Sequence, residues 1–135
     1  MKKVMQNAKR FAQVLCHNGV SAYVVDDQFP IAQQVIIRWS HPEGAHTASY
    51  RLAKVGIFVQ AIPLVESEGL HFSLRGITRL GISEADLDKL GATAANVLLG
   101  SVDLEEARSQ VRSISSRLSL YPTELKAYDM DCINK

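Results

Sequence analysis

A chain of 135 residues, 47% of them hydrophobic and 21% charged, has the size and composition of one soluble globular domain. Its formal net charge of +1 gives no electrostatic basis for binding nucleic acid or an anionic membrane surface, which attract a concentrated basic excess. The N-terminus lacks the pattern of a signal peptide and no apolar run is long enough to span a bilayer. Two cysteines without CxxC spacing, Cys16 and Cys132, are typical of a reduced cytoplasmic protein.

In the first half of the chain, the spacing of apolar residues predicts two helices and two strands. These elements span residues 4–15 (helix), 21–25 (strand), 31–39 (strand) and 45–54 (helix). Asn18–Gly19 ends the first helix and Gly56 the second, as glycine commonly does. Residues 26–30 favour a turn, so we expect the two strands to pair as a hairpin. The run Val35–Ile37 suits a central strand covered on both faces.

The second half predicts two more strands and two longer helices. The strands are 57–62, stopped by Pro63, and a segment that starts at Leu70 and loosens at Gly76. A polar loop over 65–69 joins them. The helices begin at Ser83, whose pairing with Asp86 resembles a capping box, and at Asp103; Gly100 closes the former and Tyr121–Pro122 the latter.

The order of these elements predicts the fold class. Strands and helices are mixed without alternating singly, so we expect an α+β two-layer domain with a small, mainly antiparallel sheet and helices on one face. Arg108, Gln110 and Arg112 lie on the expected outer face of the last helix and are typical of a solvated surface, although Arg112 and Arg117 could contact a partner.

The chemical motifs of the sequence predict no catalytic residue and no metal site. His41 and His46 lie five residues apart across a Pro-Glu-Gly break, which does not place two imidazoles on one helix face. Asp26–Asp27 is better explained as a turn than as a carboxylate pair. Because phosphate-binding glycine loops and nucleophile motifs are also lacking, the residues point to binding chemistry.

Arg75 is the candidate binding residue. It lies near the end of the predicted strand from Leu70, beside Gly76, which allows another group to approach closely. A guanidinium there could hold a carboxylate through two parallel hydrogen bonds. The alternative is an arginine at the strand edge that pairs with a surface carboxylate of the same chain.

Four segments together resemble the C-terminal small domain of serine hydroxymethyltransferase, a fold-type I pyridoxal-phosphate enzyme. The segments, given with the family pattern that each resembles, are Val4–Ala12 (V-x-x-N-A-x-x-L-A), Gly56–Pro63 (G-I-x-V-N-x-N-A-I-P), Ser73–Thr78 (S-G-[IL]-R-[IL]-G-T) and Val111–Pro122 (V-x-x-L-x-x-x-F-P-L-Y-P). The segment Leu74–Ser83 is also similar to threonine aldolases. The resemblance covers residues 1–122 as one small domain like that of aspartate-aminotransferase-fold enzymes and leaves 123–135 as a tail.

The resemblance implies a role for particular residues. Arg75, together with Ser73, would bind the α-carboxylate of an amino-acid substrate, with Arg79 as the alternative arginine. Gln60 falls where the family contacts folate, but the family's N-x-N is contracted there, which puts tetrahydrofolate in doubt. One-carbon and amino-acid metabolism is the implied setting.

The resemblance also implies a partner, because the cofactor lysine and phosphate site of the family belong to its large domain. This chain alone should therefore be inactive, and a large-domain polypeptide would supply pyridoxal phosphate for transferase or aldolase chemistry. The alternative is a stand-alone, non-catalytic module that binds a small carboxylate or forms a homodimer.

Overall fold

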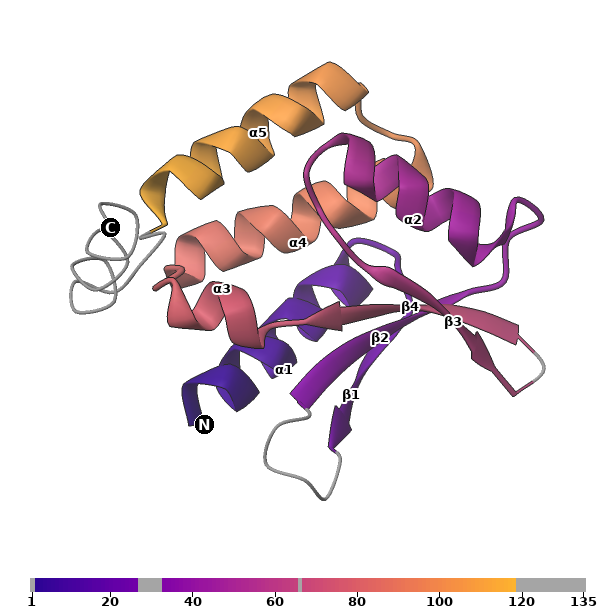
Figure 1. Ribbon diagram of the computed structural model, residues 1–135, viewed down its shortest axis with the longest axis horizontal. Helices are drawn as coiled ribbons and strands as arrows, with labels where there is room; N and C mark the ends of the chain where they lie inside the picture. The colour runs from indigo at the N-terminus through magenta and orange to yellow at the C-terminus, as the bar shows by residue number, and fades with distance from the viewer. Residues whose placement is uncertain (1, 27–32, 66, 119–135) are drawn as a thin grey trace, which may run out of the picture.

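A computed structural model describes residues 2–26, 33–65 and 67–118 as a four-stranded antiparallel sheet with helices packed on one face (Figure 1). The elements are α1 (Lys2–His17), β1 (Ala22–Asp26), β2 (Gln33–Trp39), α2 (Gly44–Lys54), β3 (Gln60–Leu64), β4 (Ser67–Ser73), α3 (Arg75–Arg79), α4 (Glu84–Leu99) and α5 (Leu104–Arg117). The predicted α+β class with a mainly antiparallel sheet is confirmed. Within the described part of the chain, no helix combines the length and apolar character needed to cross a membrane.

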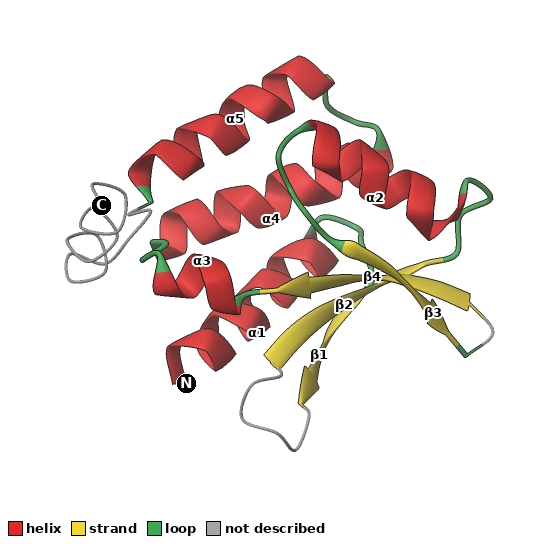
Figure 2. Cartoon of the chain, in the orientation of Figure 1, coloured by secondary structure: helices red, strands yellow, loops and turns green. Residues whose placement is uncertain are grey.

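The sheet has the strand order β1-β2-β4-β3, and the predicted hairpin of β1 and β2 is confirmed. The run Val35–Ile37 is buried in central strand β2, as expected. Helices nevertheless cover only the face of Val35 and Ile37, as Figure 2 shows for the described elements. Ile36 points to the opposite face, between Tyr23 of β1 and His71 of β4, so neighbouring side chains share in its cover.

The third strand differs from the prediction at both ends. β3 starts at Gln60 because the preceding Ile57 donates its backbone N–H to Leu52 at the end of α2, at 3.0 Å, before the chain joins the sheet. It also continues through Pro63, which an edge strand tolerates. The predicted loop 65–69 is mostly strand, since β4 begins at Ser67.

The largest departure concerns Arg75, which starts a short helix and does not lie on a strand. β4 ends at Ser73, and Leu74, fully buried, turns the chain into α3. The alternation of apolar residues favours a strand that continues to Leu74, because Phe72 and Leu74 are both buried in the core. The spacing from Leu74 to Ile77 is equally that of one helical turn, and the structure follows this second pattern.

The helix ends largely follow the sequence. The Ser83 side chain accepts a hydrogen bond from the Asp86 backbone N–H at 3.1 Å, which caps α4, and Gly100 ends α4 with φ of 71°. The Asp86 carboxylate does not complete a capping box, because it binds Arg117. Asp103 precedes α5 without a side-chain cap. The predicted stop at Tyr121–Pro122, the boundary at residue 122, the Asp27–Pro30 part of the turn and Cys132 lie outside the described residues.

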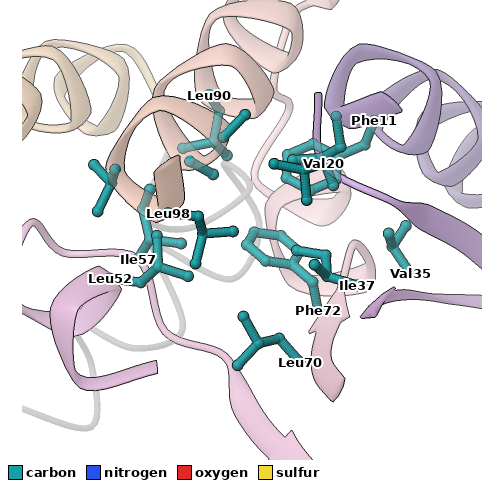
Figure 3. Packing of buried hydrophobic residues seen from close by; sticks show 14 of the residues in the cluster. Phe11, Val20, Val35, Ile37, Leu52, Ile57, Leu70, Phe72, Leu90 and Leu98 are labelled. Atoms are coloured by element: carbon teal, nitrogen blue, oxygen red, sulfur yellow. The ribbon is translucent and has the colours of Figure 1, made fainter. Parts of the chain in front are cut away.

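The hydrophobic core lies between the sheet and the helices. The rings of Phe11 from α1 and Phe72 from β4 stack with centroids 4.5 Å apart, as Figure 3 shows in close-up. Leu52 of α2 and Leu90 and Leu98 of α4 enter the same cluster. α5 packs against α4 and adds a further helical layer on the side of α4 away from the sheet (Figure 1).

Candidate functional site

The junction between β4 and α3 carries the predicted carboxylate-binding residues. Ser73 is the last residue of β4 and Arg75 the first of α3, while the buried Leu74 between them fixes the junction to the core. None of the α3 residues is fully buried. The junction therefore presents its polar side chains on the surface of a fixed backbone.

A hydrogen-bonded pair holds α3 against α1. The buried Asn7 donates through Nδ2 to Oγ1 of Thr78 at 2.9 Å, and that hydroxyl donates to the Leu74 carbonyl at 2.6 Å. Asn7 belongs to the first segment of the sequence resemblance and Thr78 to the third. Two segments that lie 71 residues apart in the chain therefore meet at the helix that carries Arg75.

Arg75 is exposed and has no hydrogen bond or ion pair with the described residues. Other arginines of the chain, such as Arg10, Arg51 and Arg117, are paired with carboxylates. Pairing of Arg75 with a surface carboxylate of its own chain, the alternative explanation, therefore finds no support among the described residues. Arg79 lies one helical turn further along α3 and is also exposed without a partner there.

Ser73 and Gln60 lie on the helix-free face of the sheet, which we call the open face. Gln60 is opposite His71, and Ser73 follows two residues later on the same strand, so both side chains share that face. The predicted residues thus form two neighbouring groups, Ser73 with Gln60 on the sheet and Arg75 with Arg79 on α3. Of these four residues, Ser73 lines the cavity described below and the other three do not.

His71 is the perturbed titratable residue of the open face. Burial lowers its pKa below the usual value, so the neutral imidazole is favoured. Its Nε2 atom is inaccessible and has no hydrogen-bond partner among the described residues. Sequence reasoning had not placed His71 beside Gln60, because that pairing follows from the strand register.

A cavity of about 630 Å³, which we call the α5 cavity, lies beside the junction. Its walls come from the α2–β3 connection, the end of β4, α3, α4 and α5; Figure 2 shows that connection as the long green curve below α2. Ser73 and Gly76 line the cavity but Arg75 does not. In the sequence, the cavity is indicated only by apolar residues on α5 and directly after it. Val111 and Leu118 are examples, and both are half-buried in the structure.

Potential metal ligands are dispersed in the described part of the chain. No group of three or more potential metal ligands comes together in the described part of the chain. The α5 cavity has mainly apolar walls, and its lining lysine, Lys54, has Nζ 5.3 Å from the Tyr50 ring centroid.

The fold is shared with a solved pyridoxal-phosphate enzyme. It matches a crystal structure of L-threonine transaldolase from Pseudomonas fluorescens in its internal aldimine state, with a TM-score of 0.71 over 94% of this chain and 32% of that one, at 20% sequence identity. This similarity establishes the small-domain architecture.

Sequence comparison adds the family to which the chain is similar. Serine hydroxymethyltransferases of Pyrococcus abyssi and Pyrococcus horikoshii are 28% and 27% identical to it in matches 120 residues long that cover 82% of this chain. The predicted resemblance to serine hydroxymethyltransferase is thereby confirmed. The match covers 28% of either relative, so the chain corresponds to part of such an enzyme. No protein-family model matches the chain.

Proposed function

We propose that this chain acts as the small domain of a pyridoxal-phosphate enzyme similar to serine hydroxymethyltransferase, with the cofactor supplied by another polypeptide. The observation that carries the proposal is Arg75, which has no acidic partner among the described residues. It lies on a surface helix that the Asn7–Thr78 pair holds against α1, in a fold shared with such enzymes.

Arg75 would bind the α-carboxylate of a small amino acid. A guanidinium without a competing acid keeps both of its parallel donors for an incoming carboxylate, which a lysine could not match. Fixing that carboxylate would orient the bonds at Cα relative to the cofactor of the partner. Ser73, on the neighbouring strand end, would add a hydroxyl donor, and Arg79 is the alternative arginine on the same helix.

The open face would contact the large-domain polypeptide. It is a sheet face that no described helix covers, and it presents Tyr23, Ile36, His71 and Gln60 in one row across the four strands. Partial burial of apolar and aromatic side chains among polar ones is typical of surfaces between domains. On this arrangement Gln60 and Ser73 would lie at the domain boundary.

The decisive experiment reconstitutes the two parts. The purified chain is mixed with a large-domain polypeptide loaded with pyridoxal phosphate, either from an adjoining reading frame or from the remaining part of the Pyrococcus abyssi relative. Adding glycine should change the visible absorbance of the cofactor only when both chains are present. Arg75→Ala should weaken the response to glycine at least tenfold, because an ionic bidentate contact is lost.

Two further variants test whether the response depends on Arg75 in particular. Arg79→Ala tests the alternative arginine, and Lys9→Gln removes an exposed helical charge on α1 as a matched control. A folded chain that gives no response with either large domain would contradict the proposal. A response that Arg79→Ala abolishes and Arg75→Ala spares would reassign the carboxylate site.

The second candidate is a stand-alone module that binds a carboxylate or forms a homodimer. Phe58, which is 79% exposed beside the α5 cavity, favours it, because a large exposed aromatic side chain commonly marks a contact surface. Light scattering of the isolated chain and calorimetric titration with glycine or serine would distinguish the two. Dimerisation or amino-acid binding without a partner would favour the module.

A further inference from the structure

The α5 cavity combines apolar walls with a cationic mouth. A site that binds only a small polar amino acid does not need such apolar walls. The walls include Ile57, Phe72, Ile77, Val111, Ile114 and Leu118. The charged residues that line it are Lys54, Arg108 and Arg112, and no aspartate or glutamate lines it among the described residues.

The three cations at the mouth differ in their availability. Arg108 donates from Nε and Nη2 to the Lys54 carbonyl at 3.0 and 2.8 Å, so it covers the carbonyl end of α2. Lys54 itself lies over the Tyr50 ring. Arg112, one turn beyond Arg108 on α5, is exposed and has no acidic partner among the described residues. Arg112 is therefore the cation available to a ligand.

We propose that the α5 cavity binds an apolar monocarboxylate, a single-chain acid of about eight to ten carbons. The tail would lie among the apolar walls and cover part of the exposed Phe58, and the carboxylate would bind Arg112. A volume of about 630 Å³ lies within the usual range of small-molecule sites, which are mostly apolar with few polar groups. The positive mouth selects an anion over a neutral or cationic amphiphile.

This inference does not rest on the proposed function. Arg75 does not line the cavity, and the ligand would bind the isolated chain without a large domain or a cofactor. Failure of the reconstitution experiment would leave it standing, and its own failure would leave the role of Arg75 untouched.

The first test is calorimetric titration of the full chain with a series of carboxylates. Affinity should rise about fourfold for each carbon added from hexanoate to octanoate, as expected for burial of each CH₂ group. Octylammonium and octanol should bind at least tenfold more weakly than octanoate. Equal affinity for octanoate and octylammonium, or no chain-length dependence, would overturn the proposal.

Two pairs of variants locate the site. Arg112→Gln should weaken octanoate binding about tenfold, whereas Lys9→Gln on α1 should not. Ser115→Trp, which projects a large ring from an exposed position that lines the cavity, should abolish binding. Ser116→Trp, exposed on the same helix outside the lining, should retain it. Circular dichroism checks that each variant folds, and identical behaviour within either pair would overturn the assignment.

Other occupants of the cavity would give different results. A concentration-dependent dimer that Ser115→Trp dissociates, in a chain that does not bind octanoate, would show that a second copy covers the cavity. Octanoate binding that appears only after deletion of residues 119–135 would show that the chain covers its own cavity. Either result would overturn the proposal of a free ligand site.

Discussion

At the scale of single residues, a buried polar side chain, Asn7, holds two helices in position. Asn7 is 3% exposed, and its bond to Thr78 is a direct polar link between α1 and α3. Burying an amide is favourable only when it is hydrogen-bonded, so the pair fixes the two helices in one arrangement. The placement of α3, which carries Arg75, thus depends on a buried residue of another helix.

Substitution of Asn7 by alanine tests this dependence. We expect a loss of about 1–3 kcal/mol in the free energy of unfolding, because the Thr78 hydroxyl loses its buried donor. Urea denaturation measures the loss, and hydrogen exchange at Thr78 and Leu80, whose N–H groups bond to the Leu74 and Gly76 carbonyls, should accelerate more than exchange in α4. Gln6→Ala, at the exposed neighbouring position, is the control. Equal effects of the two substitutions would contradict the positioning role.

At the scale of elements, close packing explains a glycine in the middle of α4. A Cβ added to Gly91 would meet Cγ1 of Val14 at 2.8 Å, so α1 and α4 approach closely at this position. Glycine inside a helix is about 1 kcal/mol less favourable than alanine. At Gly91 the close contact between α1 and α4 offsets this cost. On α3, by contrast, a Cβ at Gly76 would meet nothing within 4 Å.

The two glycines should therefore respond in opposite ways to alanine. Gly91→Ala should destabilise the protein by about 1–2 kcal/mol, since overpacking outweighs the gain in helix propensity. Gly76→Ala should be neutral or stabilise by up to about 1 kcal/mol. Thermal and urea unfolding measure both, and Val14→Ala should relieve part of the Gly91→Ala loss. A stabilising Gly91→Ala would refute the close approach.

At the scale of the whole molecule, α4 is the helix to which the other long helices are tied. Arginines of α1, α2 and α5 each reach α4, through the contacts Arg10–Asp88, Arg51–Val97 carbonyl and Arg117–Asp86. Hydrogen bonds from Arg117 and Arg10 lower the pKa of Asp86 and Asp88 respectively. These contacts make stability depend on pH in the acid range.

Two separate pH windows should appear in the stability of the protein. The pKa of His71 is lowered from 6.5 by burial, so the unfolded chain binds its proton first and stability falls as pH drops below about 6.5. The pKa values of Asp86 and Asp88 are lowered from 3.8, so their contribution is present above about pH 4 and is lost as pH falls through the lower folded values.

Urea denaturation at pH 7.5, 5.5 and 3.5 measures both windows. We expect His71→Gln to flatten the change between pH 7.5 and 5.5 and to leave the loss at pH 3.5 unaltered. Arg117→Gln should reduce the acid window alone. A wild-type chain that is equally stable at pH 7.5 and 5.5 would contradict the buried, neutral state of His71.

The sequence by itself determined the elements whose apolar spacing is regular and whose ends carry strong signals. α1, α4, α5 and the β1–β2 hairpin are of this kind, because a helix or strand face and a capping residue are local properties. It also singled out Arg75 as a cation suited to a carboxylate, and the resemblance implies a substrate-binding role that the reconstitution experiment tests.

Only the tertiary structure decided the remainder. Leu74 continues the strand alternation from Phe72 and also stands one helical turn before Ile77, and burial of Leu74 together with the Asn7–Thr78 bond favours the helix. Gly69 favours a loop in the sequence, but it lies in β4, paired with Arg38 and Ile62 on the neighbouring strands and covered by Leu64. The open face and the α5 cavity could not be foreseen, because their residues come from separate elements and meet only through strand register and helix packing.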